Sequence, residues 1–338
     1  MTASERTITL FRADVAESRH PMMGVVCTPD GSVVRAWGDD PDAVVFPRSA
    51  LKPLQALPLV ESGAADAFAV TDEELALACA SHNGLPMHVE RVAAWLARIG
   101  CTVDDLECGA HAPYDAAATR AIHAAHAEPS ALHNNCSGKH TGMLTVCRHL
   151  GLPTQGYSRA DHPLQQRILT TYAETTGTPE SAMPVGIDGC SLPAAAMPLR
   201  GLATAMARFA APDGHFPPGR AEAARRLCRA WAAHPELVAG PQTFNTDAMV
   251  LTGGRVLLKR GAQGVYGGCI PDTGIGFAIK AESGSSVAAD AMTAVVMRAL
   301  KLVDDATWQA LTDLPYFRET SWRGLPAGTY RPEGGWPA

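Results

Sequence analysis

Ser49 and Lys52 have the types and spacing of a nucleophile and its base. Residues three apart on a helix lie about one turn from each other, so the Lys52 amine can reach the Ser49 hydroxyl. A serine attacks a carbonyl carbon only after a base removes its proton, and lysine serves as that base when burial or a neighbouring cation lowers its pKa. The same pair could also be a helix cap and a solvated lysine, so this motif alone does not establish catalysis.

Polar residues gather among predicted turns in three further segments, 81–84, 133–140 and 186–191. A fourth segment, 259–265, ends one predicted strand and begins another. A Ser-x-x-Lys on an early helix, a polar loop in the middle and a late lysine followed by glycine is the order of active-site elements in penicillin-recognising serine hydrolases. Such residues could hydrolyse an amide, which needs a nucleophile, a base that later protonates the leaving group, and donors for the oxyanion.

The composition is that of a globular protein, with 46% apolar and 18% charged residues in 338. The net charge is −6 and no basic block occurs, so we expect no nucleic-acid partner. No run of about 18 apolar residues is present, so we expect no membrane association. The nine cysteines are scattered, which favours reduced thiols and a cytoplasmic location over a disulfide framework.

The elements that must position these residues are strands near both chain ends and helices between them. Alternating apolar residues and turn signals predict strands at 22–27, 32–37, 43–46, 255–259, 264–270 and 274–280. Helical periodicity predicts helices that begin near Ser49 and at 75–80, 86–99, 116–127, 142–150, 162–175, 191–209, 220–233 and 286–302, and Thr71 and Glu74 could form a capping box.

We therefore predict an α+β fold, in which both chain ends build one antiparallel sheet covered by helices. The sheet would come from about 8–46 and 255–281, and the mostly helical middle would span 49–235. We expect a single catalytic domain over 1–338, with an irregular tail at 324–338 because that segment is rich in Pro and Gly.

Four strings in this order resemble the Rhizobium etli-type, or class 3, L-asparaginases of the asparaginase II family. They are Phe46-Pro47-Arg48-Ser49-x-x-Lys52-Pro53, Ser81-His82-Asn83-Gly84, Asn134-Asn135-Cys136-Ser137-Gly138-Lys139-His140 and Asp188-Gly189-Cys190. The resemblance covers residues 10–305. It implies the fold of serine β-lactamases, DD-peptidases and glutaminases, hydrolysis of L-asparagine to L-aspartate and ammonia, two Ser-Lys pairs, a nearby zinc ion and a homodimer.

The resemblance also assigns roles to residues of this chain. Ser49 with Lys52 resembles the first catalytic pair, and Ser81 with Lys259 resembles the second, although Lys280 also lies on a late predicted strand and is the alternative to Lys259. The residues that resemble the zinc ligands are Cys136, Lys139 and Cys190, and those that resemble substrate-binding positions are Arg48, Asp188, His82 and Asn83. Zinc held this way could orient substrate without being essential for turnover.

This chain departs from the pattern of the family at two places that bear on substrate preference. Asn83 stands where a smaller serine is expected, and segment 240–247 lacks an arginine expected before its Asn-Thr. A glutaminase, a serine acylase that acts on another small amide, and a non-catalytic asparagine-binding protein therefore stay open. Cys136 and Cys190 could also be small buried hydrophobic residues, as most free cysteines are. The sequence does not choose which serine is acylated.

Overall fold

The computed structural model describes residues 7–333, and the chain divides into two compact units. The sheet unit consists of Met1–Ala50, Met197–Ala211 and Gln242–Ala338, and the helical unit consists of Leu51–Ala196 and Pro212–Pro241. Strands from both chain ends form an antiparallel sheet and the middle of the chain is mostly helical, which confirms the predicted fold class. The single-domain assignment stays a prediction.

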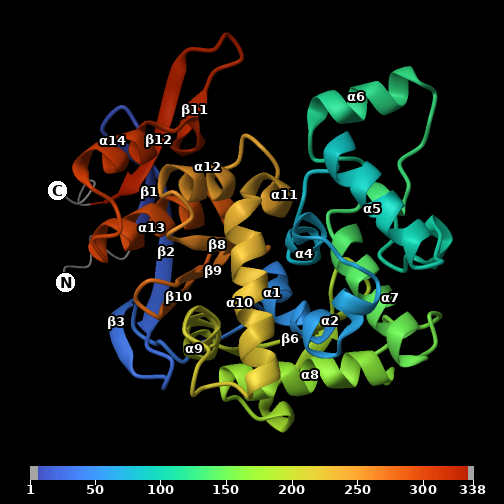
Figure 1. Cartoon of the computed structure of the whole chain (residues 1–338). Coiled ribbons are helices and arrows are strands. Elements are labelled where there is room, and N and C mark those ends of the chain that lie inside the picture. Colours follow the sequence, from blue (N-terminus) through green and yellow to red (C-terminus); the bar gives the residue numbers. More distant parts are fainter. Residues whose placement is uncertain (1–6, 334–338) are drawn as a thin grey trace. The chain divides into compact units, whose positions relative to one another are not determined.

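The main sheet of the sheet unit is antiparallel, in the order β11-β12-β1-β2-β10-β9-β8, with β3 also paired to β2 (Figure 1). Its strands are β1 (Thr7–Arg12), β2 (Val15–Cys27), β3 (Val33–Trp37), β8 (Leu257–Arg260), β9 (Val265–Ile270), β10 (Ile275–Ala281), β11 (Arg318–Thr320) and β12 (Pro326–Pro332). The predicted strand at 43–46 is reduced to β4 (Val44–Val45), which pairs with β7 (Met197–Pro198).

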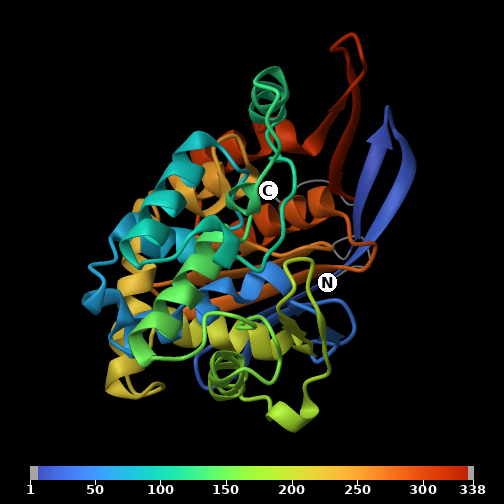
Figure 2. The same cartoon turned by 90° about the vertical axis from the view of Figure 1, so that its right-hand side faces the viewer.

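Helices α9 (Leu199–Ala210) and α13 (Ser286–Ala299) cover opposite faces of this sheet (Figure 2). A Cβ on Gly276 would lie 2.1 Å from the backbone N of Ala207 in α9. A Cβ on Gly24 would instead lie 3.8 Å from Met292 of α13. Gly276 pairs with Cys27, three residues from Gly24, and side chains alternate along a strand, so the two glycines face opposite sides. Strands β9 and β10, in the middle of this arrangement, are buried on both faces.

Two predictions for individual elements are wrong, each for an identifiable reason. The helix expected at 191–209 begins only at Leu199, because Pro193 and Pro198 lack the N–H of a helix interior and lie in or next to short strands. The tail expected to be irregular from 324 contains strand β12, whose partner β1 lies at the other end of the chain. Residues 334–338 of that tail lie outside the described residues. Helices α12 (Phe244–Leu251) and α14 (Asp305–Asp313) are additional to those predicted.

The helical unit packs its helices around α7, whose residues 137–147 are all buried. Its elements are α1 (Lys52–Gln55), α2 (Leu57–Glu61), α3 (Ala64–Ala67), α4 (Asp72–Ala78), α5 (Pro86–Arg98), α6 (Ala116–Ala124), α7 (Ser137–Leu150), α8 (Pro163–Thr176), β5 (Val185–Ile187), β6 (Pro193–Ala195), α10 (Pro218–Ala233) and α11 (Pro235–Ala239). The predicted capping box is confirmed: Thr71 accepts from the Glu74 N–H, and the Glu74 carboxylate accepts from the Thr71 N–H.

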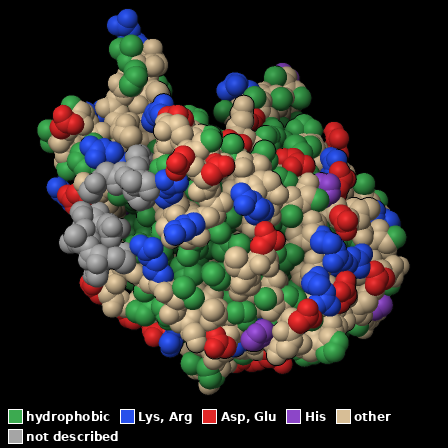
Figure 3. All heavy atoms as spheres, turned by 60° about the vertical axis from the view of Figure 1, so that its left-hand side comes forward, with side chains coloured by type: hydrophobic (Ala, Val, Ile, Leu, Met, Phe, Trp, Pro, Cys, Tyr) green, Lys and Arg blue, Asp and Glu red, His purple; other side chains and the backbone are tan. Residues whose placement is uncertain are grey.

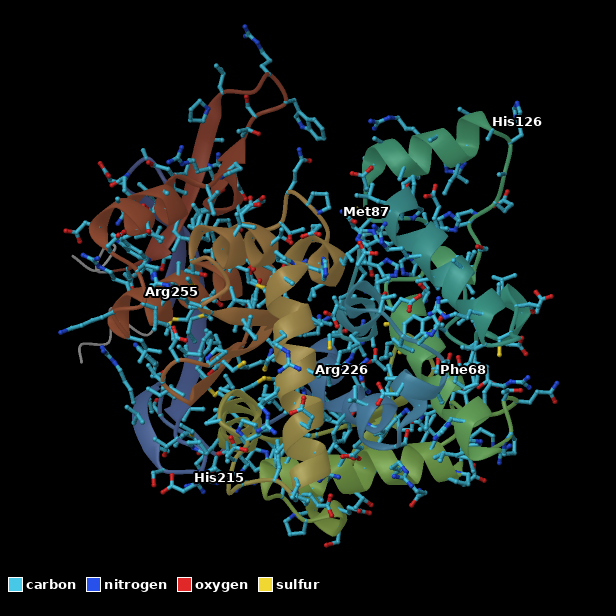
Figure 4. All side chains as sticks on the ribbon, viewed as in Figure 1. Phe68, Met87, His126, His215, Arg226 and Arg255 are labelled. Atoms are coloured by element: carbon cyan, nitrogen blue, oxygen red, sulfur yellow. The ribbon has the colours of Figure 1, made fainter. Side chains whose placement is uncertain are left out.

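Charged side chains tie the outer helices of the helical unit together. Arg226 of α10, labelled in Figure 4, forms an ion pair with Asp66 of α3. Arg220 of the same helix contacts Glu61 at 2.9 Å. On the face of the molecule that Figure 3 shows, acidic and basic side chains are interspersed. Within residues 7–333, no helix combines the length and the apolar character that crossing a bilayer requires.

Candidate active site

The first turn of α7 is held in place by the residues that precede it. The Asn134 side chain donates to the carbonyl oxygens of Cys108 and Gly109 at 2.9 and 3.0 Å, and it accepts from the Cys136 N–H at 2.9 Å. A Cβ on Gly138 would lie 2.5 Å from the Leu77 carbonyl oxygen, so only glycine allows α7 to approach α4 this closely. Cys136 and Lys139 are thereby fixed beside the end of α4, and Ser81 follows that helix in the sequence.

Lys52 is the buried base candidate of the helical unit, with a side chain that is 1% exposed. Its Nζ contacts the carbonyl oxygens of Ala80 at 2.5 Å and Asn135 at 3.3 Å, and the Ser81 hydroxyl at 2.9 Å. Burial lowers the pKa of Lys52. The same Nζ is hydrogen bonded to the Cys136 side chain, so Lys52 contacts both Ser81 and Cys136.

Cys136, Lys139 and Cys190 form a second, adjoining cluster in the helical unit. The Lys139 Nζ lies 3.1 Å from the Cys190 Sγ, and the two cysteine side chains are hydrogen bonded to each other. The cluster is almost fully buried, because the exposed fractions of Cys136, Lys139 and Cys190 are 5%, 4% and 3%. The three side chains come from the start of α7 and from the loop between β5 and β6.

The electrostatics of this cluster favour one thiolate and one ammonium. The hydrogen bond from Cys190, together with the positive charge of Lys139, holds the pKa of the Cys136 thiol well below its usual value, although burial opposes this. The same hydrogen bond and burial raise the pKa of Cys190. Burial opposes a charge on Lys139, but the two sulfurs outweigh it and raise the Lys139 pKa.

The donor atoms of this cluster fit a zinc ion. Two sulfurs and one nitrogen are ligands that zinc prefers, and three protein ligands leave a fourth position open. Residues 7–333 contain no group of three or more His, Cys, Asp or Glu side chains that could hold a metal, so Lys139 would have to be the third ligand. Zinc binding would then require Lys139 and Cys190 to lose their protons, which couples metal affinity to pH.

Asp188 and Asn83 lie in the same unit as the cluster. The Asp188 carboxylate accepts from the Gly189 N–H at 2.6 Å, and its charge contributes to the raised pKa of Lys139. Asn83 packs against Gly240, where a Cβ would lie 2.4 Å from the Asn83 amide oxygen. That oxygen is buried and has no hydrogen-bond partner among the described residues. It is therefore available to a ligand.

His82 has no free ring nitrogen. Its Nδ1 accepts from the Gly84 N–H at 3.2 Å, which assigns the proton to Nε2, and Nε2 donates to the Ser137 hydroxyl at 2.9 Å. The ring is fully buried and stacks on His88. A direct contact with substrate would require one of these bonds to break. His82 instead links the segment that carries Ser81 to the first turn of α7 through these hydrogen bonds.

The remaining site residues lie in the sheet unit. Ser49 is in the 3₁₀ turn Arg48–Leu51, which continues directly into α1, and Arg48 has a left-handed φ of 54°. Lys259 is 1% exposed in β8. A Cβ on Gly261 would lie 2.3 Å from the Pro47 carbonyl oxygen, so the chain just after Lys259 lies against the segment that carries Ser49.

Lys280, the alternative to Lys259, has a different environment in the sheet unit. Its Nζ contacts the carbonyl oxygens of Gln263 and Ala281, both at 2.6 Å. Both hydrogen bonds hold the Lys280 ammonium against backbone oxygens at the ends of strands. Lys259 likewise contacts a neighbouring carbonyl oxygen, that of Arg260 at 3.0 Å, and the choice of Lys259 over Lys280 stays a prediction.

Asn135 and Ser137 received no role from the sequence, although both belong to the motif that carries Cys136 and Lys139. Their roles depend on partners that are distant in the sequence, Lys52 for Asn135 and His82 for Ser137. The Nδ1 of His140 lies 2.6 Å from the Tyr157 hydroxyl, which accepts from the Glu107 N–H and so donates to the ring, whereas the His140 Nε2 is buried with no hydrogen-bond partner among the described residues. Only the density of polar residues in 133–140 indicated these contacts.

Comparison with known proteins gives one family. The family model for L-asparaginase II matches residues 8–332, which include every residue of the two clusters and nearly the whole chain. No protein with curated annotation matches the chain.

Proposed function

This chain belongs to the L-asparaginase II family and is an L-asparaginase, and we propose that it hydrolyses L-asparagine by Ser-Lys nucleophilic catalysis beside a zinc site. The observation that carries the mechanism is the contact of the Lys52 Nζ with the Ser81 hydroxyl at 2.9 Å. Two carbonyl acceptors orient the amine, and burial lowers the pKa of Lys52. A buried lysine that is neutral near pH 7 can take a proton from a serine.

The reaction proceeds in two halves. A serine oxygen attacks the side-chain carboxamide carbon while Lys52 takes the serine proton, and the lysine then returns that proton to the leaving ammonia. The resulting β-aspartyl ester is hydrolysed by water, which the second serine and its lysine activate. The Ser81 hydroxyl is within hydrogen-bond reach of Lys52. Ser49 precedes Lys52 by about one helical turn in the chain, so both serines stay candidates for acylation.

Cys136, Lys139 and Cys190 would hold the zinc ion, which as a Lewis acid would orient polar groups of the substrate. Asp188, beside this cluster, would accept a hydrogen bond from the substrate ammonium. Arg48 and Asn83 would provide further polar contacts. His82 supports the site through Ser137 and Gly84. A homodimer and a cytoplasmic location are further parts of the proposal, supported by the family resemblance and by the cysteine usage.

The test is ammonia release from L-Asn and, separately, from L-Gln, by the wild-type protein and by the variants Ser49→Ala, Ser81→Ala and Cys136→Ala. We expect turnover of L-Asn by the wild type, and we expect each serine variant to be slower by about 100-fold or more in kcat. Cys136→Ala should mainly raise KM. Mass-spectrometric mapping of the acylated peptide identifies the nucleophile. Ser321→Ala, in the turn between β11 and β12, is the control.

Turnover of L-Gln at a rate equal to that of L-Asn would contradict the substrate assignment. Full activity of both serine variants would contradict the mechanism, since neither hydroxyl would then take part. Elution of the purified protein at the size of a monomer in size-exclusion chromatography would contradict the homodimer.

A further inference from the structure

Asn135 contacts both clusters of the helical unit. Its carbonyl oxygen lies 3.3 Å from the Lys52 Nζ, and its side-chain Oδ1 accepts from the Cys136 Sγ at 3.1 Å. We propose that Asn135 is a positioning residue that couples the Lys52–Ser81 pair to Cys136, so that the base and the metal-binding sulfur keep one fixed geometry. This inference rests on the proposed function and adds to it a residue that would touch neither the substrate nor the metal.

The backbone of Asn135 is fixed from the side opposite to Lys52. Its N–H donates to the His111 Nε2 at 3.0 Å. Because that nitrogen accepts, the His111 proton lies on Nδ1, which donates to the Ala112 carbonyl oxygen at 2.6 Å. The backbone of Asn135 therefore has one hydrogen bond at its N–H and one at its carbonyl oxygen, which is the acceptor for Lys52.

The chemistry of sulfur determines how the side-chain amide must be turned. A cysteine that binds a metal does so as a thiolate, which can only accept hydrogen bonds. The structure places Oδ1 against the Cys136 thiol, but the oxygen and nitrogen of an amide are assigned from their surroundings, and the atom that faces a thiolate is Nδ2. Asn135 then donates one hydrogen bond to the Cys136 sulfur, as outer residues around metal ligands commonly do.

The two contacts are mechanically linked because they belong to one residue. A movement of the sulfur shifts the amide, and the amide shifts the carbonyl that orients the Lys52 amine. Catalysis depends on positions held to within about 0.5 Å. We therefore expect a change at the Asn135 side chain to affect the base as well as the metal site, although only the metal site touches that side chain.

The test uses Asn135→Ala and Asn135→Asp. The alanine variant removes the amide and keeps the backbone contacts, and we expect zinc affinity to fall about 10- to 100-fold. At saturating zinc and L-Asn we expect kcat to stay about tenfold below that of the wild type. The aspartate variant is nearly isosteric but places a negative oxygen against the thiolate, so its zinc affinity should be lower than that of the alanine variant.

Zinc affinity is measured by competition with a chromogenic chelator, and kcat and KM by ammonia release. The controls are Gln309→Ala and Gln309→Glu, which make the same chemical changes at an exposed amide of α14. A purely structural role would lower the melting temperature and leave the zinc affinity of the folded protein unchanged. Thermal melts of the metal-free variants separate the two cases.

Three outcomes would overturn the inference. Zinc affinity and kcat in Asn135→Ala equal to those of the wild type would remove any coupling. An aspartate variant that binds zinc as well as the wild type would show that no N–H faces the sulfur. A wild-type protein that binds no zinc would also overturn it. A wild-type protein that binds zinc but releases no ammonia would instead refute the proposed function, and the affinity comparison would still test the donor to Cys136.

Discussion

The Lys52 Nζ lies 2.9 Å from the Ser81 hydroxyl, although the two residues are 29 positions apart. Lys52 begins α1, and Ser81 follows α4, whose end approaches α7 at Gly138. The sequence had paired Lys52 with Ser49 and Ser81 with Lys259. The structure brings Lys52 to Ser81 within the helical unit.

Replacement of Lys52 by methionine removes the amine and keeps an unbranched side chain of similar length. General-base catalysis contributes about 100- to 10,000-fold, so we expect kcat for L-Asn to fall by at least about 100-fold. Ammonia release measures the effect. Lys52→Arg should fail to restore activity, because a guanidinium does not lose its proton near neutral pH. Activity of either variant within threefold of the wild type would contradict the assignment of the base.

The two late lysines should behave differently. Lys259→Met is expected to lower kcat by about 100-fold if Lys259 activates a serine or the water. Lys280→Met should keep kcat and lose only stability, because the Lys280 ammonium is bound to the carbonyl oxygens of Gln263 and Ala281. Comparing kcat with the melting temperature in both variants checks this. The opposite pattern would assign the chemistry to Lys280.

Two glycines of α7 offer a matched pair of substitutions. A Cβ on Gly138 would lie 2.5 Å from the Leu77 carbonyl oxygen, whereas a Cβ on Gly142 would have ordinary contacts of 3.4 Å or more. Gly138→Ala should therefore displace Cys136 and Lys139 and cost about 1–3 kcal/mol of stability. Gly142→Ala should be neutral or slightly stabilising, because alanine favours a helix. Denaturant unfolding and zinc affinity measure both effects, and equal effects in the two variants would contradict the close approach of α7 and α4.

Asp290 of α13 should make the free energy of unfolding decrease as pH rises, whereas a carboxyl with a lowered pKa would make it increase. Burial raises the pKa of Asp290 to about 6 from 3.8, although the Tyr266 hydroxyl donates to it at 2.6 Å and Arg260 lies 3.6 Å away. The folded protein then binds this proton more tightly than the unfolded chain does. The stabilisation is complete below the unfolded pKa and is lost as pH rises through about 4 to 6, by up to about 3 kcal/mol.

The variant Asp290→Asn isolates this effect, since asparagine is neutral at every pH. We expect the unfolding free energy of the variant, relative to the wild type, to increase between pH 4 and pH 7. Denaturant titrations at several pH values measure the difference. A difference that stays constant, or that decreases as pH rises, would show that Asp290 is charged throughout the folded state.

Local sequence signals determined much of the fold. The Thr71–Glu74 capping box and the strands β8, β9 and β10 follow from residues that are near one another in the chain, and they occur within a few residues of where they were predicted. Strand β12 was not predicted, and β1 was predicted only as part of the sheet region 8–46, without strand bounds of its own. Each becomes a strand by pairing with a segment from the other end of the chain, which no local pattern records.

The sequence by itself supplied the reactive residue types, the order of the motifs and the family. Only the tertiary structure decided which of those residues meet. Lys52 reaches Ser81 and Asn135, and Lys139 reaches Cys190, 51 positions away, because close helix packing at Gly138 and the turn between β5 and β6 bring them together. The reason is physical: hydrogen bonds and charges act over a few ångströms in space, and separation along the chain does not fix that distance.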